Sequence, residues 1–425
     1  MNKTLSPVKM AIYISIISII LTLLPRRMYS DMISEKNYMY ADYNLYLFIL
    51  LCLLGFISGA SLIKVSRIKT KSSYKIRSLN ILESRALLLI LTLISLLFIL
   101  KFNSQFGVLK MLALALGNET GPYRLTINKF LGDTNQSYFI PVTLTIITLI
   151  YVNMNFSEVK YSNLDKFLYW SNVGLNIICC LVLLNKGPVI NLFLVFIVVK
   201  ILRFKGRSIY SSMATIAQVA LVIFAALFAF SALQNSRVSG NSKNPVYYNL
   251  IGYFSASYNR ASAIMSQDLK YPGQGSSINT LEGVWYAPIV SERLKFAQIG
   301  ERLGITIPTD GFKNWQQSFI KLRAAGLNEE FNWTTIYGAA FSDYNWYGFL
   351  WFVLYGAFAQ IIYRYAIMGG VIQISAYVFI IFSMQWWSTA IVFNRDSSFV
   401  YILIGSLLVY KTISGKVSFR RREGI

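Results

Sequence analysis

The sequence contains no histidine and only three cysteines, and these absences remove whole classes of chemistry. Histidine is the most frequent general base and the most frequent metal ligand. Without it, any general base or metal ligand in this chain must be another residue type. Cys52 and the adjacent pair Cys179 and Cys180 lie in apolar stretches, so they give neither a disulfide framework nor a metal-ligand spacing. We therefore expect no metal ion and no cofactor.

Acidic residues are also scarce, and the charge of the chain is one-sided. Charged residues make up 14% of the chain, with 40 Lys and Arg against 18 Asp and Glu, which gives a net charge of +22. In a soluble protein this balance would indicate nucleic acid as a partner. The chain is 55% apolar, however, and basic residues in short loops orient membrane helices. The expected partner is therefore the lipid bilayer and not nucleic acid.

Apolar runs long enough to cross a bilayer recur along the chain, and they are continuous, which predicts helices. We predict an all-α polytopic membrane protein with about ten transmembrane helices and one large periplasmic loop. The first run has no small-residue cleavage motif, so we expect it to be retained as a helix. The predicted spans are about 10–25, 44–63, 86–102, 137–153, 167–185, 188–202, 209–233, 344–363, 371–392 and 397–410.

Basic residues assign the two sides of the membrane. If the N-terminus is cytoplasmic, the inside loops hold more than half of the 40 Lys and Arg residues. They include a dense cluster from Lys64 to Arg85 and a basic tail from Lys411 to Arg422. We therefore predict that both termini are cytoplasmic and that the long segment between the seventh and eighth spans lies outside the cytoplasm.

That long segment, 234–341, is polar in an otherwise apolar chain. It divides the chain into an N-terminal bundle of about seven helices over 1–233, the large outer loop over 234–341, and C-terminal helices with the basic tail over 342–425. Membrane helices do not need such a segment merely to fold. We predict that it caps the bundle and holds the substrate site.

Several basic residues in outward segments form a candidate anion site, because arginine binds phosphate oxygens through two parallel hydrogen bonds and lysine supplies a point charge. The candidates are Lys186, Arg237, Arg260, Arg124 and Arg293. Lys186 precedes a predicted span that is short for a bilayer, so it would lie below the outer surface, where a lysine is costly. The alternative for each arginine is that it snorkels toward the membrane surface or forms a plain ion pair with an acid such as Asp268 or Glu282.

A second candidate is the segment that leads into the eighth span, Asn332 to Gly348. Asp343 has two interpretations here: an N-cap of that span, or a carboxylate that orients or deprotonates a sugar hydroxyl. Aromatic residues such as Tyr337 are candidates for contact with the sugar. We interpret Trp351 and the Trp386–Trp387 pair instead as an interfacial belt.

The stretch Thr-Thr-Ile-Tyr-Gly, followed by Phe-Ser-Asp-Tyr-Asn-Trp-Tyr-Gly-Phe, covers 334–349 and resembles the end of the periplasmic loop in Wzy-type O-antigen polymerases. The spacing from Arg260 to Gly273 is similar to an arginine–glycine pattern of that family, with twelve intervening residues instead of ten. Lys186-Gly187 stands where the family has Arg-Gly, and this departure removes the bidentate geometry of arginine. The layout of many spans with one large late loop also matches.

The resemblance implies a bacterial inner-membrane glycosyltransferase with a GT-C-like bundle. It would move a growing glycan from undecaprenyl pyrophosphate to the non-reducing sugar of a lipid-linked repeat unit, without a metal ion. In these roles Lys186, Arg237 and Arg260 would hold the pyrophosphate, Asp343 would address the acceptor hydroxyl, and Arg124 would serve either lipid. A chain-length regulator protein is a further partner that the family would allow.

Three other functions remain open from the sequence. An O-antigen ligase uses the same donor with a lipid A core acceptor, and such enzymes usually carry a loop histidine, which this chain lacks. A lipid-linked oligosaccharide flippase would be expected to show internal repetition and charges inside the bundle. A non-catalytic assembly partner would need fewer spans.

Overall fold

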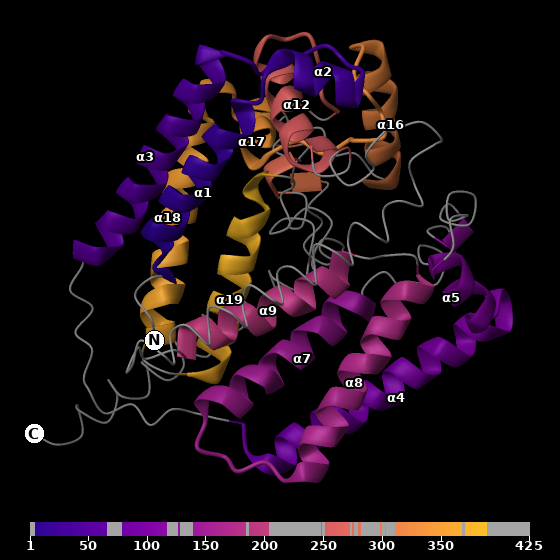
Figure 1. Cartoon of the computed structure of the whole chain (residues 1–425). Helices are drawn as coiled ribbons and strands as arrows, with labels where there is room; N and C mark the ends of the chain where they lie inside the picture. Colours follow the sequence, from indigo (N-terminus) through magenta and orange to yellow (C-terminus); the bar gives the residue numbers. More distant parts are fainter. Residues whose placement is uncertain are drawn as a thin grey trace, which may run out of the picture.

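The computed structural model describes most of the chain: residues 5–65, 79–116, 126–127, 139–183, 187–203, 248, 251–272, 274–275, 279–281, 298–299, 302, 311–367 and 370–388. Every secondary-structure element in this part of the chain is a helix, which confirms the all-α prediction for the residues described. Figure 1 shows two groups of long helices and a compact assembly of shorter helices at one end of the first group.

The first group of helices runs from that compact assembly toward the end of the molecule where the chain begins (Figure 1). Within it, α18 packs along α3 and against α19, and α1 packs on α3. Its members are α1 (Pro7–Thr22), α3 (Tyr43–Val65), α18 (Gly348–Ile367) and α19 (Val371–Gln385).

The second group is inclined to the first in the view of Figure 1. Its contacts are between α4 and α8 and between α7 and α9, while α5 packs on α8 and α4. Its members are α4 (Ile81–Phe106), α5 (Val108–Leu116), α7 (Phe139–Phe156), α8 (Asn163–Val182) and α9 (Gly187–Arg203). Helix α19 contacts both α7 and α9, so it joins the two groups.

The compact assembly, which we call the cap, draws on both halves of the chain. It contains α2 (Arg26–Ile33), α12 (Ser255–Met265), α16 (Gly311–Ala324) and α17 (Ile336–Tyr344). Helix α2 follows α1 after a bend of 82°, which turns the chain over the cap. The predicted outer loop therefore supplies only part of the cap. The boundary expected at 341/342 falls inside α17 and is not a break in the structure.

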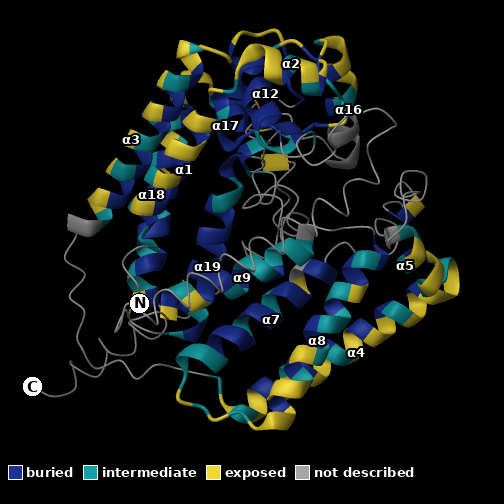
Figure 2. Cartoon of the chain, viewed as in Figure 1, coloured by how far each residue is buried: buried dark blue, intermediate teal, exposed yellow. Residues whose placement is uncertain are grey.

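Four described helical segments are long and apolar enough to cross a membrane, or five if the bent pair α1 and α2 counts as one span. The four are Tyr43–Ile63, Ile81–Phe106, Ile336–Ile367 and Val371–Ser388. Burial separates them: 83% of the apolar window is buried in the last segment but only 28% in Ile81–Phe106. Figure 2 shows the same contrast between α19 and α4. Helix α19 is thus the centre of the bundle, and α4 is apolar and exposed as a lipid-facing helix would be.

Eight of the predicted spans coincide with helices, namely α1, α3, α4, α7, α8, α9, α18 and α19. The spans predicted at 209–233 and 397–410 lie outside the described residues, so the count of ten stays a prediction. The belt interpretation is wrong for Trp387, which is fully buried. Its ring packs among those of Phe56, Phe352 and Tyr355, because η5 (Trp386–Ser388) ends α19 inside the bundle.

The contact between α3 and α18 depends on glycine. Gly55 and Gly59 are four residues apart on α3, and Gly356 faces them from α18. A Cβ atom added at Gly59 would lie 1.9 Å from the backbone oxygen of Val353, and one at Gly356 would lie 2.1 Å from that of Phe56. Such spacing of small residues lets two membrane helices approach backbone to backbone.

We predict that Gly59→Ala destabilises the protein by about 1–3 kcal/mol, because the added methyl group forces α3 away from α18. Thermal unfolding of the purified protein in detergent measures this. Gly174→Ala is the matched control, since a Cβ atom at Gly174 in α8 would have no atom within 4 Å. Equal stability of the two variants would contradict the close contact.

The cap and the loop between α7 and α8 should face opposite sides of the membrane. We predict that a membrane-impermeant maleimide labels Gln274→Cys from outside intact cells and labels Lys160→Cys only after the membrane is opened. Both positions are exposed, and the native cysteines are buried, which keeps the background low. Labelling of both positions from one side would overturn the topology.

Candidate functional site

Arg260 lies in the middle of α12 and forms a fully buried ion pair with Glu35. All eleven residues of α12 are buried, which its many small side chains permit. The Arg260 Nη2 to Glu35 Oε2 distance is 3.0 Å and the Nη1 to Oε1 distance is also 3.0 Å, so the pair is bidentate. The two side chains are 0% and 1% exposed. Glu35 belongs to the segment that follows α2.

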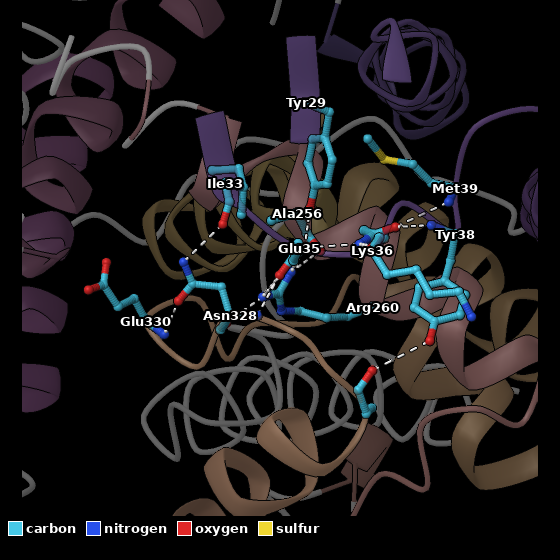
Figure 3. Close-up of polar contacts among 12 residues, drawn as sticks. Tyr29, Ile33, Glu35, Lys36, Tyr38, Met39, Ala256, Arg260, Asn328 and Glu330 are labelled. Carbon is cyan, nitrogen blue, oxygen red and sulfur yellow. Dashed lines mark hydrogen bonds and ion pairs between the residues drawn. The ribbon is translucent and has the colours of Figure 1, made fainter. Parts of the chain in front are cut away.

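Glu35 accepts hydrogen bonds from three further groups, as Figure 3 shows. Tyr29 Oη and Asn259 Nδ2 donate to Oε1, the latter at 2.9 Å, and the backbone N–H of Asn328 donates to Oε2 at 2.6 Å. A buried carboxylate is tolerated when its lone pairs are used in this way. One side chain therefore joins α2, α12 and the segment after α16.

The segment from Ser34 to Asp42 runs along α12 as a strap, and side chains of α12 hold its backbone. Asn259 Oδ1 accepts from the N–H groups of Tyr38 and Met39 at 2.5 and 3.2 Å, and its Nδ2 donates to Lys36 O at 2.7 Å. Ser262 Oγ donates to Tyr38 O at 2.9 Å. The strap is bounded by two residues with positive φ, Ser34 at 55° and Ala41 at 57°.

Asn328 extends the network toward the surface. Its Nδ2 donates to Tyr248 Oη at 3.1 Å, and that hydroxyl donates to Glu330 Oε2 at 2.6 Å. Burial raises the pKa of Tyr248, so the phenol remains a hydrogen-bond donor at neutral pH. Figure 3 shows a second contact of Asn328, whose Oδ1 accepts from Glu330 N at 3.0 Å, while its backbone oxygen accepts from Arg260.

This geometry favours the alternative interpretation of Arg260, an ion pair with an acid. The acid is Glu35 and neither Asp268 nor Glu282. The remaining Nη hydrogens of Arg260 reach Ala256 O at 2.7 Å and Asn328 O at 2.6 Å, and only Nε has no partner. In this arrangement Arg260 offers no surface to a pyrophosphate. Sequence reasoning missed Glu35 because it lies 225 positions away, although the predicted topology places both residues outside.

Tyr337 is placed in the interior of the bundle and not in a binding site. It is fully buried, its ring stacks on Phe352 with centroids 5.7 Å apart, and its hydroxyl lies 3.4 Å from Ser15 Oγ. Its aromatic partners come from α12, α18 and η5, so Tyr337 connects the cap to the membrane helices.

Asp343 lies near the end of α17, and the N-cap interpretation is wrong. The eighth span does not begin at Asp343, because α17 contains it and the 3₁₀ turn η4 (Asn345–Tyr347) separates α17 from α18. The N-cap of α17 is Thr335, whose hydroxyl accepts from Gly338 N at 3.1 Å. Asp343 instead accepts hydrogen bonds from a different segment of the chain.

That segment is Asn279 and Thr280, which provide four donors to the Asp343 carboxylate. Asn279 donates its N–H and Nδ2 to Oδ1 at 3.3 and 2.9 Å, and Thr280 donates its N–H and hydroxyl to Oδ2 at 2.7 and 2.8 Å. Asp343 is 6% exposed. The buried Asp343 carboxylate therefore holds residues 279–280 against α17. Asp343 also borders a pocket.

The pocket beside Asp343 has a volume of about 280 Å³ and is open to solvent. Its floor consists of buried residues from α12 and α17, and its rim of exposed residues after each helix. The lining residues are Ile264, Gln267, Gln274, Gly275, Phe341, Ser342, Asp343, Tyr344 and Asn345. Across it, Gly275 N donates to Ser342 O at 2.9 Å. We call it the Asp343 pocket.

The structure thus brings Arg260, Tyr337 and Asp343 into neighbouring helices, but it puts only Asp343 at the pocket. The other predicted site residues, Arg124, Lys186, Arg237 and Arg293, lie outside the described residues. Within the described part of the chain, no group of His, Cys, Asp and Glu could hold a metal ion.

Comparisons with known proteins add no family assignment. No protein-family model, no curated protein and no solved structure matches the chain. The resemblance to Wzy-type polymerases therefore rests on its own motifs and on the layout of the chain.

We predict that Glu35→Gln and Arg260→Gln each destabilise the protein by about 3–5 kcal/mol, because each leaves one buried charge unpaired. The double variant should be more stable than the sum of the two losses implies, because it buries no charge. Thermal unfolding measures all three. Arg323→Gln is the control, since its pair with Glu329 is exposed and its loss should leave the unfolding temperature unchanged. Simple additivity would contradict the coupling.

Proposed function

We propose that this protein is a bacterial inner-membrane polymerase of a surface polysaccharide, such as an O-antigen. It transfers the growing glycan from undecaprenyl pyrophosphate to the non-reducing end of a lipid-linked repeat unit. The observation that carries the proposal is the Asp343 pocket, which has a buried carboxylate at its floor and lies where the cap meets the membrane helices.

The position of the pocket suits a substrate that is held in the bilayer. Asp343 is five residues before α18, and the turn between them presents Trp346 and Tyr347, which are 37% and 73% exposed. Tyr43 at the start of α3 is 82% exposed. Exposed Trp and Tyr at helix ends are typical of the membrane–water interface. A sugar attached to a lipid in that interface can reach the pocket from the side.

The chemistry requires an acceptor hydroxyl oxygen to attack the anomeric carbon of the donor glycan. The bond from that carbon to the pyrophosphate oxygen breaks, undecaprenyl pyrophosphate leaves, and the hydroxyl proton passes to the Asp343 carboxylate and from there to water. Asp343 is suited to orient the hydroxyl. The hydrogen bond from the Asn279 N–H, at 3.3 Å, is the longest that its carboxylate accepts, and the substrate hydroxyl would replace it. Negative charge develops on the pyrophosphate, where fixed cations stabilise it most.

Lys186, Arg237, Arg124 and Arg293 remain the proposed cations for the pyrophosphate. Because Arg260 is paired with Glu35, it does not bind the pyrophosphate in this proposal. Its role is to position α12 beneath the pocket. No step requires a metal ion. The proposed topology has cytoplasmic termini and a periplasmic cap, and a chain-length regulator protein remains a proposed partner.

The rival functions differ in what they require of the membrane helices. An ion-coupled flippase would need charges deep in the bundle. Among the described residues the buried ionisable acids and bases are Glu35, Asp165, Arg260 and Asp343, and all lie in the cap or at a helix end. A ligase would use the same donor and differs only in the acceptor.

The test is a reaction of the purified, reconstituted protein with a synthetic lipid-linked repeat unit. We predict a ladder of longer lipid-linked glycans, and we predict that Asp343→Asn lowers the rate about a hundredfold while the protein remains folded. Asp31→Asn, at an exposed acid of α2, is the matched control and should keep the full rate.

Three results would contradict the polymerase. Translocation of the lipid-linked unit without any polymer would assign a flippase. Transfer only to a lipid A core acceptor would assign a ligase. A normal rate in Asp343→Asn would remove the carboxylate from the reaction.

A further inference from the structure

We propose that the Asp343 pocket binds one uncharged sugar ring of the acceptor, and that Gln267, Gln274 and Asn345 at its rim select that ring. The assignment to the acceptor rests on the proposed function. The assignment of an uncharged, hydroxyl-rich ligand rests on the lining of the pocket alone.

The lining excludes an anion. None of the nine described residues that line it is Lys or Arg, and the single charged group among them is the carboxylate of Asp343. A phosphate or a uronic acid would face that carboxylate without a compensating cation. The pyrophosphate of either lipid must therefore bind elsewhere, which separates an acceptor subsite from the donor subsite.

The polar groups of the rim match hydroxyl groups. An amide side chain carries both donors and an acceptor, and a sugar hydroxyl also does both. Among the described residues the side-chain amides of Gln267 and Gln274 have no hydrogen-bond partner, whereas the Asp343 carboxylate has four. The rim thus presents two amides that are available for hydrogen bonds with a ligand, beside a carboxylate that already accepts four.

The size and floor of the pocket suit a single ring. A volume of about 280 Å³ is at the small end of ligand pockets, which span roughly 300–1,000 Å³. Ile264 and Phe341 give the floor an apolar part, on which the C–H face of a sugar ring can pack. The open side leaves room for the rest of a glycan to continue into solvent.

Three residues at the rim of the pocket have a positive φ. Gln267 has φ 64°, Gly275 has φ 80° and Asn345 has φ 53° with ψ −143°. Non-glycine residues rarely adopt such conformations and keep them where the surroundings hold them. Here Gln267 N donates to Ile264 O at 3.1 Å, and Asn345 Oδ1 accepts from Trp346 N at 2.8 Å. Gln267 and Asn345 carry amides and line the same pocket, so these two conformations place both amides at its rim, whereas the other described non-glycine residues with positive φ, Ser34 and Ala41, belong to the strap.

The test uses the full chain in lipid nanodiscs and free monosaccharides as probes. Saturation-transfer NMR is run with neutral hexoses, N-acetylhexosamines and 6-deoxyhexoses, and with glucuronic acid and inorganic pyrophosphate as anions. We expect a signal from at least one neutral sugar that neither anion displaces. Gln267→Gly and Gln274→Ala should each weaken its binding about three- to tenfold, the loss expected for one hydrogen bond. Gln317→Ala, at an exposed amide of α16, is the control and should bind normally.

The outcomes separate this inference from the proposed function. Binding of no neutral sugar, displacement by either anion, or unchanged binding in both variants would overturn the pocket assignment, even if the protein makes polymer. Conversely, selective sugar binding by a protein that makes no polymer would leave the pocket assignment intact and overturn the polymerase.

Discussion

The buried pair between Glu35 and Arg260 is the interaction on which the cap depends. Two charges removed from water lose several kcal/mol of solvation each, and only a bidentate contact with further hydrogen bonds offsets that loss. Glu35 and Arg260 meet the condition with donors from three separate segments. The pair thereby fixes α12 against the strap. Because Ile264 lies one turn beyond Arg260 on α12 and Gln267 follows two residues after the end of that helix, the same contact helps to position the floor and rim of the Asp343 pocket.

Small residues allow close packing that holds the cap helices in a fixed position on the membrane helices. A Cβ atom at Gly338 of α17 would lie 3.0 Å from the Cα of Ala261, so α12 and α17 touch nearly backbone to backbone. The same device at Gly59 and Gly356 brings α3 against α18. Since η4 alone separates α17 from α18, the pocket is attached to a membrane helix through a short and closely packed connection. A site on such rigid elements keeps its geometry better than one on a loop.

The sequence predicted the features that hydropathy controls and missed those that depend on pairing. Continuous apolar runs located eight of the described helices, and four segments among the described residues are long and apolar enough to span a membrane, or five if the bent pair α1 and α2 counts as one. Hydropathy cannot tell which face of a helix is inside, so Trp387 and Tyr337 were assigned to an interface and a binding site although both are core residues. Nor does spacing reveal a partner 225 positions away, which is why Glu35 was not found. Asp343 was located at the site, but its donors at Asn279 and Thr280 followed only from the fold.

The distribution of buried polarity limits where chemistry can occur. In the described part of the second group, helix contacts use neutral side chains: Thr92 Oγ1 donates to Asn172 Oδ1 at 3.1 Å, and Asn176 Nδ2 donates to Thr143 Oγ1. Neutral pairs of this kind hold membrane helices together without moving charge. The one buried acid of that group, Asp165, lies at the start of α8 and is paired with Arg85 at 2.6 Å. Among the described residues, the buried acids and bases therefore form no relay through the bundle, since they lie in the cap or at a helix end. In the reaction that we propose, the membrane helices would hold the two lipids and the cap would receive the sugars.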